Sequence, residues 1–301
     1  MCKLTVFTAT YNRGHLIHRL YESLQKQSDF DFEWLVIDDG SSDNTKELFE
    51  KWLAEHNRFI IRYYYQENQG LIRTLNRGIA LAKGKYFSKI DSDDYVLCDY
   101  SKNIMNWIKE IDDSSELYAV SGLRIRADGT PLKGCMPKIP IGKDYIDATD
   151  LERKKYDLDA DMCEAWKTDV LRKHPFPVWQ GEKFAPEQLV LYELALKGLK
   201  IRWYPIAMSV CEYQEGGLTL GASKLEKENP MGYAMMYNQN LKIYSSIKRN
   251  LYDAMQMIAL IAYARKFSYL KKSNNKLATI LTFPFGLLLG IRRRVQYSRI
   301  Q

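Results

Sequence analysis

Asp91, Ser92, Asp93 and Asp94 place three carboxylates within four positions of the chain. They follow residues 86–90, where apolar and polar side chains alternate as in a short buried strand. Carboxylates this close repel one another, and a bound divalent cation would cancel the repulsion. Hard oxygen ligands suit Mg²⁺ or Mn²⁺. The alternative is a solvated acidic turn that caps the next helix, since Asp is a favourable N-cap residue.

Three further polar clusters follow segments of strand composition. Residues 4–8, 34–37 and 59–65 are rich in β-forming residues, and they lead into residues 10–12, 38–43 and 68–70. Helical apolar spacing lies between them, and we expect the third helix to end at Gly84. Alternating strands and helices with short connections predict a mostly parallel central sheet flanked by helices. Since ligands bind at the carboxyl ends of such strands, the four clusters predict a single site.

Length and composition are typical of a globular cytoplasmic protein. The 301 residues suffice for two domains, or for one large domain with an appendage. The N-terminus lacks the charged and apolar regions of a signal peptide, so we expect the chain to stay in the cytoplasm. No cysteine pair shows CxxC spacing, which argues against a disulfide framework or a zinc site: Cys2, Cys98, Cys135, Cys163 and Cys211.

The net charge of +7 comes from the C-terminal tail. No acidic residue follows Asp253, whereas nine basic residues do. Without those nine, 35 basic residues stand against 37 acidic ones, so the rest of the chain carries a net charge of −2. This distribution argues against a nucleic-acid groove on the main body and for an anionic partner at the C-terminus.

The tail also contains the least polar run of the chain. Residues 231–248 and 252–267 have helical spacing, and residues 277–291 are apolar apart from interruptions at Pro284, Gly286 and Gly290. These 15 residues fall short of the ~20 that a spanning helix needs. Basic residues on both sides favour attachment to an anionic membrane surface. The alternatives are a C-terminal hairpin packed on the body and an interface with a second subunit.

Four segments, taken in order, resemble the successive motifs of the inverting family 2 glycosyltransferases with the GT-A fold: TATYNR, VIDDGSSDNT, ENQGLIRTLNRGIALAKGKY and IDSDDYV. The resemblance covers residues 3–100 strongly and residues 160–220 more loosely. It implies the nucleotide-diphospho-sugar transferase fold, a nucleotide-sugar donor with uridine as the expected base, and a divalent metal. It also implies direct displacement with inversion at the anomeric carbon.

The resemblance divides the chain at residue 220. Residues 1–220 are expected to form the catalytic domain, with a donor-binding half at 1–100 and an acceptor-side half at 101–220. Residues 221–301 are expected to be a helical, basic extension. Similar bacterial enzymes build surface polysaccharides, which implies a saccharide acceptor on a lipid carrier and a position on the inner face of the cell membrane.

Each polar cluster receives a role from the same resemblance. Tyr11 is expected to pack against the nucleobase, and Asp39, more than Asp38, to hydrogen-bond it. Asp93 is expected to ligate the metal together with Asp91, with Asp94 supporting Asp93. The remaining expected donor-binding residues are Thr10, Asn68, Gly70, Arg73, Asp91 and Ser92. The structural alternatives are a core tyrosine at Tyr11, a solvated turn at Asp38 and Asp39, and a solvated helix arginine at Arg73.

Glu187 resembles the catalytic base of the family. It follows Pro186 and precedes an apolar helix expected over residues 189–196. An acceptor hydroxyl needs a carboxylate to take its proton, an effect worth ~10²–10⁴ in rate. Glu182 on the same loop is the second candidate for the base. The alternative for Glu187 is a first-turn glutamate that the helix dipole stabilises.

One departure from the family concerns the metal. Many relatives carry a histidine after the last strands, which we expect here as a strand pair over residues 201–213. Gln214 occupies that neighbourhood and no histidine follows it. The third protein ligand is therefore not defined by the sequence.

Other classes of protein fit less well. A dinucleotide-dependent oxidoreductase needs GxGxxG after the first strand, where only Gly14 is present. A P-loop is nearly matched at residues 78–85, but the spacing is one residue too long and Tyr86 follows the lysine. A nucleotidyltransferase would have a basic, glycine-rich loop after the first strand. The non-enzyme alternative is a catalytically inactive sugar-nucleotide-binding protein.

Overall fold

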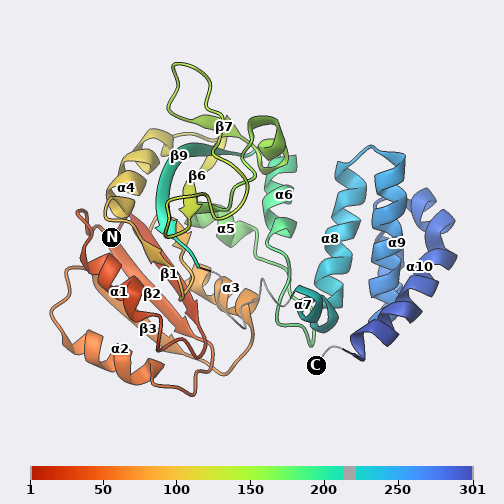
Figure 1. The fold of residues 1–301 in the computed structure, drawn as a ribbon, viewed down its shortest axis with the longest axis horizontal. Coiled ribbons are helices and arrows are strands. Elements are labelled where there is room, and N and C mark those ends of the chain that lie inside the picture. The colour runs from red at the N-terminus through yellow and green to blue at the C-terminus, as the bar shows by residue number, and fades with distance from the viewer. Residues whose placement is uncertain (1, 213–221, 300–301) are drawn as a thin grey trace. The chain divides into compact units, whose positions relative to one another are not determined.

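The computed structural model describes residues 2–212 and 222–299, and the described chain divides into two compact units (Figure 1). The first unit takes in residues 1–175 and 191–214, and the second takes in residues 176–190 and 215–301. The segment that carries Glu187 therefore packs with the C-terminal helices. The functional boundary expected at residue 220 stays a prediction.

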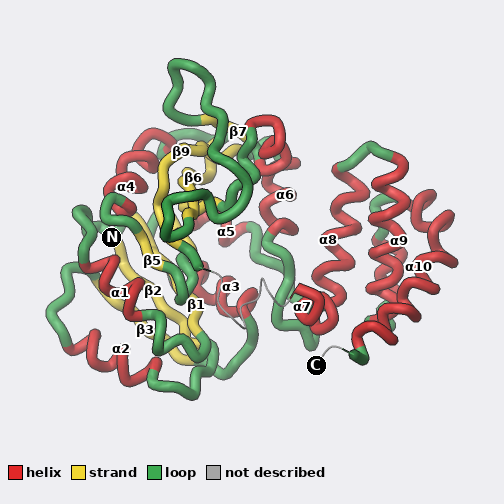
Figure 2. The backbone as a smooth tube through the Cα atoms, viewed as in Figure 1, coloured by secondary structure: helices red, strands yellow, loops and turns green. Residues whose placement is uncertain are grey.

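A mixed sheet forms the centre of the first unit (Figure 2). Its strands run in the order β3-β2-β1-β4-β8-β6-β9-β5, and β7 pairs with β9. The bounds are β1 (Leu4–Thr10), β2 (Phe32–Asp38), β3 (Ile60–Tyr65), β4 (Tyr86–Lys89), β5 (Tyr95–Val96), β6 (Leu117–Ile125), β7 (Ile146–Ala148), β8 (Met162–Lys167) and β9 (Lys200–Val210).

The expected parallel arrangement is found along β3-β2-β1-β4, and β6 and β9 also pair parallel. β1 runs parallel to both β2 and β4, and β2 runs parallel to β3. β8 enters between β4 and β6 and is antiparallel to both, which makes the whole sheet mixed. The carboxyl ends of β3, β2, β1 and β4 consequently lie along one edge.

Helices flank the sheet of the first unit (Figure 1). They are α1 (His18–Gln25), α2 (Thr45–Ala54), α3 (Leu71–Leu81), α4 (Tyr100–Ile111), the 3₁₀ helix η1 (Asp150–Tyr156), α5 (Thr168–Lys173) and α6 (Gln188–Leu196), which begins in the second unit. A buried aromatic cluster joins α1 and α2 to β2, with Tyr21 and Trp52 stacked at 4.3 Å beside Trp34. Stacked pairs add about 0.5–1.5 kcal/mol beyond the area that they bury.

The expected end of α3 at Gly84 is wrong. The helix ends at Leu81, and the next residue, Ala82, has already left the helical conformation. Gly84 serves a different purpose, because a Cβ atom at this position would lie 2.4 Å from the backbone nitrogen of Thr5. The glycine therefore allows the chain to approach β1 before β4 begins.

The strand pair expected over residues 201–213 is also wrong, since β9 is one strand over Lys200–Val210. Its pairing with β6 shifts between Ser121 and Leu123, opposite a stretch that contains Pro205. Proline cannot donate a ladder hydrogen bond, so an irregularity at this point keeps the strand continuous.

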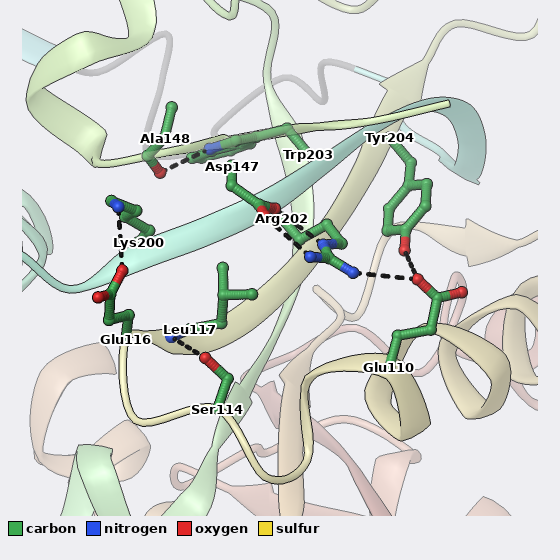
Figure 3. A network of polar contacts seen from close by, with 10 residues as sticks. All are labelled: Glu110, Ser114, Glu116, Leu117, Asp147, Ala148, Lys200, Arg202, Trp203 and Tyr204. Atoms are coloured by element: carbon green, nitrogen blue, oxygen red, sulfur yellow. Dashed lines mark hydrogen bonds and ion pairs between the residues drawn. The ribbon is translucent and has the colours of Figure 1, made fainter. Parts of the chain in front are cut away.

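Arg202 links β9 to its surroundings (Figure 3). Its Nε and Nη2 each donate to Asp147 on β7 at 2.8 Å, and its Nη1 donates to Glu110 on α4 at 3.1 Å. The hydroxyl of Tyr204 donates to the same Glu110 oxygen at 3.0 Å. This network ties β9 to β7 and α4.

The second unit is helical. It contains α7 (Ala222–Glu228), α8 (Pro230–Ile243), α9 (Ile247–Tyr263), the 3₁₀ helix η2 (Phe267–Lys272) and α10 (Lys276–Tyr297). α8, α9 and α10 lie side by side (Figure 1) around a core that includes Met257, Ile258 and Ile261. Among the described residues, none of the helices has the length and hydropathy needed to cross a bilayer.

The apolar run near the C-terminus is a continuous helix. α10 extends through Pro284, Gly286 and Gly290 without a break. A Cβ at Gly286 would lie 2.6 Å from Cβ of Ile258, and one at Gly290 would lie 3.0 Å from the carbonyl oxygen of Ala259. The glycines thus allow α10 to pack closely on α9 within the second unit. The alternative of a hairpin packed on the body stays a prediction.

Candidate active site

The topology brings the four polar clusters together. The strands that precede them are neighbours in the order β3-β2-β1-β4 and run parallel, so their carboxyl ends meet. Hydrogen bonds join the loop after β1 to the loop after β2. The backbone nitrogen of Asn12 donates to Ser41 Oγ at 2.9 Å, and that of Ser42 donates to Asn12 Oδ1 at 2.8 Å. The predicted convergence at one sheet edge is confirmed.

Asp39 fastens the turn that starts α3. Its Oδ1 accepts the Gln69 backbone N–H at 2.8 Å and the Gln66 Nε2 at 2.6 Å, and its Oδ2 accepts the Gly70 N–H at 2.8 Å. Asn68 Nδ2 donates to the carbonyl of Asp39 at 2.8 Å. Gly70 has φ 90°, which a residue with a side chain rarely adopts. A carboxylate can accept about four hydrogen bonds, and Asp39 already accepts these three. The contact from Asp39 to a nucleobase stays a prediction.

Asp38 points into the protein. It is fully buried, and its two oxygens accept the Ser41 N–H at 2.7 Å and the Tyr63 hydroxyl at 2.6 Å. Burial, together with the Asp38 carboxylate, raises the pKa of Tyr63 far above its ordinary value. The alternative of a solvated acidic turn is therefore wrong for both Asp38 and Asp39, because Asp39 is buried as well.

The end of β1 presents two different side chains. Tyr11 is 51% exposed, so the alternative of a core tyrosine is wrong. Thr10 is buried, and within the described residues its Oγ1 has no hydrogen-bond partner. An unsatisfied buried hydroxyl costs about 1–3 kcal/mol.

Arg73 lies in the first turn of α3, where its Nη1 donates to the carbonyl of Gln69 at 3.2 Å.

Arg124 organises the acidic motif after β4, although none of the sequence motifs indicated it. Its Nη1 lies 3.1 Å from Asp91 Oδ2 and 3.2 Å from Asp94 Oδ2. The guanidinium also donates to the carbonyl oxygens of Met162 and Lys89, at 2.9 and 3.3 Å. The available signal was an arginine within the otherwise uncharged strand β6, where a largely buried charge requires partners.

Asp93 lies apart from this pairing. Arg13 is its nearest cation, with Nη2 3.9 Å from Asp93 Oδ2, and the Asp93 side chain is 22% exposed. Burial and the charge of Asp91 raise the pKa of Asp93. Burial and Asp91 likewise raise the pKa of Asp94 to about 7. Although burial acts to raise the pKa of Asp91, the charges of Lys89 and Arg124 outweigh it and lower that pKa.

These observations bear on the expected metal. Asp93 fits a divalent cation, because its carboxylate is partly exposed and a nearby positive charge would offset the repulsion from Asp91. Ser92 beside it is buried, and Asp91 is paired with Arg124. Across the described part of the chain, no three His, Cys, Asp or Glu side chains gather in an arrangement that could hold a metal. Gln214 lies outside the described residues.

The two candidate bases differ in their surroundings, and both lie in the second unit. Glu182 is buried, and its two oxygens accept the backbone N–H groups of Met231 and Gly232 at 2.7 and 3.0 Å. It therefore caps the N-terminus of α8. Glu187 is partly exposed and lies in the turn before α6, where its carbonyl accepts the Val190 N–H at 3.0 Å. Of the two side chains, that of Glu187 is the more exposed.

The loop before Glu187 is held by α8. Asn229 Oδ1 accepts the backbone N–H groups of Lys183 and Phe184, both at 2.8 Å. A Cβ at Gly232 would lie 3.1 Å from Cα of Ala185, so this glycine allows the close approach. Glu182, Asn229 and Gly232 thus connect the loop to the start of α8, and we call these three residues the brace.

Comparison with known sequences identifies the domain that holds the polar clusters. A sequence model described as "Glycosyl transferase family 2" matches residues 5–130. This range contains β1 to β6 and all the strand-end residues described above. Residues 5–130 are similar to glycosyl transferase family 2 domains.

Curated relatives extend this similarity. Three bacterial sequences that are 33 to 36% identical match 31 to 36% of this chain, and the chain covers only 29 to 36% of their own lengths. A longer match is the Campylobacter jejuni GalNAc(5)-diNAcBac-PP-undecaprenol beta-1,3-glucosyltransferase, which is 24% identical over 238 residues, or 77% of this chain and 72% of the relative.

Solved structures share the fold of the chain. S. aureus TarS 1-349 in complex with UDP-GlcNAc matches with a TM-score of 0.63 at 20% identity, over 95% of this chain and 81% of the TarS 1-349 chain. The Pyrobaculum calidifontis mannosyltransferase PcManGT in complex with GDP-Man and Mn²⁺ matches with a TM-score of 0.56 at 16% identity, over 97% and 87% of the two chains. The expected GT-A fold is confirmed.

Proposed function

We propose that the protein is an inverting glycosyltransferase that moves a sugar from a nucleotide-diphosphate donor, with UDP expected, to an acceptor hydroxyl. The observation that carries the proposal is the convergence of four polar strand ends at one edge of the sheet, within residues that are similar to family 2 domains. TarS and PcManGT, which have the same fold, were each solved with a nucleotide-sugar. Parallel sheets of this kind bind ligands at that edge.

The residues at the end of β1 are suited to the donor. The exposed ring of Tyr11 is available to stack on a nucleobase, and a polar donor atom would supply the partner that Thr10 Oγ1 lacks among the described residues. Asp39 keeps Asn68, Gly70 and Arg73 in place by holding the turn before α3. We propose that these residues form the donor site together with Asp91 and Ser92.

The metal assigned to this site is Mg²⁺ or Mn²⁺, held chiefly by Asp93. Asp91 is the second proposed ligand, although its carboxylate is already paired with Arg124. When bound, such a cation neutralises charge that develops on the leaving diphosphate. Arg13 beside Asp93 adds a positive charge from the protein itself.

Glu187 is the proposed general base. It would take the proton of the acceptor hydroxyl as the new bond forms at the anomeric carbon. Attack from the face opposite the leaving diphosphate inverts the configuration, and this requires a single base. Glu182 is the weaker candidate, because both of its oxygens already accept backbone N–H groups.

The proposed acceptor is a saccharide on a lipid carrier, in the synthesis of a cell-surface polysaccharide. The Campylobacter jejuni relative, by its name, acts on an undecaprenol-linked acceptor. We propose that this protein works at the inner face of the cell membrane, because such an acceptor is anchored there.

The decisive experiment is the variant Glu187→Gln. It keeps the shape of the side chain but removes the base, so we expect turnover to fall by at least 10². Binding of a nucleotide-sugar, measured by calorimetry with and without Mn²⁺, should stay within about twofold. Full turnover in Glu187→Gln would refute the assignment of the base. The absence of binding to every member of a nucleotide-sugar panel would refute the transferase itself.

A further inference from the structure

The two opposite faces of α10 differ in the size and polarity of their side chains. The face that packs on α9 is a narrow stripe of mostly small residues spaced three or four apart: Ala278, Thr282, Gly286, Gly290, Arg293 and Tyr297. The opposite face carries large aliphatic side chains, which we call the outer face: Leu277, Ile280, Leu281, Leu288, Ile291 and Val295. Their spacing of three, four and seven residues places them on one side of the helix.

The outer face is exposed along the whole length of the helix. Exposed fractions are 68% for Leu277, 70% for Ile280, 65% for Leu288 and 61% for Ile291. A helix of 22 residues is about 33 Å long. Single exposed apolar residues are ordinary, but a continuous stripe of this length marks an interaction surface.

The charges around the outer face indicate what it binds. Exposed basic side chains lie at both ends of α10 and on η2, including Lys271, Lys272, Lys276, Arg292 and Arg299. No acidic residue follows Asp253 in the sequence. Arg293 is the exception among these cations, because it is buried and paired with Glu226 at 3.2 Å.

We propose that the outer face of α10 lies in the interfacial region of an anionic phospholipid bilayer. An apolar helix face bordered by Lys and Arg binds such a surface through buried apolar area and attraction to anionic headgroups. A second copy of the chain is the less favourable occupant, since two uncompensated basic tails would then meet. The inference deepens the proposed membrane location and rests on it.

Flotation of the full-length protein with phospholipid vesicles tests the proposal. We expect binding to vesicles that contain phosphatidylglycerol and little binding to pure phosphatidylcholine. The double variant Ile280→Asp with Leu288→Asp should reduce binding at least tenfold. Replacing Arg292 and Arg299 by Gln should weaken binding about fivefold per charge at low salt. The matched control is Leu53→Asp on α2, another exposed leucine, and it should bind like the wild type.

Several results would overturn the proposal. Equal binding to neutral vesicles would do so, as would undiminished binding by the double Asp variant. Light scattering tests the alternative of a second copy. The proposal would also fail if the wild type were a dimer that bound no vesicles and that only outer-face variants dissociated. If the double Asp variant does not fold, the double variant Ile280→Ser with Leu288→Ser is tested in its place. Vesicle binding needs neither donor nor base, so Glu187→Gln should bind normally even if the proposed chemistry is wrong.

Discussion

Arg124 shows how a single residue can set the geometry of a motif. Its guanidinium contacts Asp91, Asp94 and two backbone carbonyls, and it thereby decides which carboxylates of the motif are already neutralised. Asp94 is buried and also accepts the Cys211 thiol at 2.9 Å. The three acids of the motif therefore have different surroundings, and Asp93, unlike Asp91 and Asp94, is not paired with Arg124.

Arg124→Met should strongly lower the free energy of unfolding. It leaves the buried Asp94 without its cation, and breaking a buried ion pair typically costs about 3–5 kcal/mol. Asp91 adds less, because it is partly exposed and lies 3.7 Å from Lys89. Urea unfolding measures the loss, and Arg126→Met on the same stretch, whose guanidinium is exposed, serves as the control. Adding Asp94→Asn should recover part of the stability, since it removes one unpaired charge. A cost within 0.5 kcal/mol of the control would contradict this account.

The cysteines provide a prediction that depends on pH. Burial raises the pKa of Cys163 from its ordinary value of 9.0 to about 12, whereas Cys98 and Cys135 are exposed. Below pH 9 the thiol is protonated in both folded and unfolded states. Above that pH the unfolded thiol ionises and the folded one does not, so this group's contribution to stability is lost as the pH rises toward 12.

Thiol labelling at pH 8 checks the same environment. Cys98 and Cys135 should react with a disulfide reagent in the native protein, because the thiolate is the reactive form and their sulfurs are accessible. Cys163 and Cys211 are buried and should react only after unfolding in guanidinium. Rapid native labelling of all five cysteines would contradict the described burial.

At the scale of elements, the turn before α3 separates two roles of Asp39. The carboxylate caps this turn whether or not a donor is bound, since its partners are Gln66, Gln69 and Gly70 of the protein itself. Asp39→Ala should therefore lower the stability of the donor-free protein by about 1–3 kcal/mol, the cost of unsatisfied buried donors.

Thermal unfolding without any nucleotide measures this effect. Glu67→Gln, an exposed change in the same turn, is the matched control and should be near neutral. If Asp39 served only to contact the nucleobase, Asp39→Ala would unfold at the wild-type temperature until a donor was added. That result would refute the capping role.

The elements also show which features were predictable. Strand composition and short connections predicted β1 to β4, and parallel pairing then required their polar ends to meet. The end of α3 was mispredicted, because Gly84 is there for its close approach to Thr5, a tertiary contact that local patterns do not contain. β9 was mispredicted for a similar reason, since its pairing with β6 carries the chain past Pro205 as one strand.

For the whole molecule, the sequence indicated a helical tail but not where its unit begins. Residues 176–190 precede α6 in the chain, yet they pack with the C-terminal helices. The partners of Glu182 and Asn229 lie 45 to 50 residues away in sequence, and no periodicity reveals such pairing. The parts of the site that depend on strand ends were predictable from the sequence. The parts that depend on side-chain contacts between distant segments, such as those of Arg124, were not.

The division into units predicts that binding and turnover can be separated. The proposed donor residues belong to the first unit, whereas Glu187 belongs to the second, on a loop held by the brace. Asn229→Ala removes the acceptor of two backbone N–H groups next to that loop. We expect kcat to fall 10- to 100-fold, because a misplacement of about 1 Å costs that much, while the dissociation constant for the donor stays within about twofold.

Asn229→Asp distinguishes positioning from general loss of structure. The Asp side chain retains an oxygen that accepts the backbone N–H groups of Lys183 and Phe184. It loses the hydrogen bond that the Asn229 amide donates to the carbonyl of Leu225. We therefore expect Asn229→Asp to recover much of kcat. Steady-state kinetics and calorimetry of donor binding measure the two quantities on the same preparations. If the affinity for the donor falls in parallel with kcat, or if Asp rescues nothing, then the brace supports only folding and the helical unit has no part in placing the base.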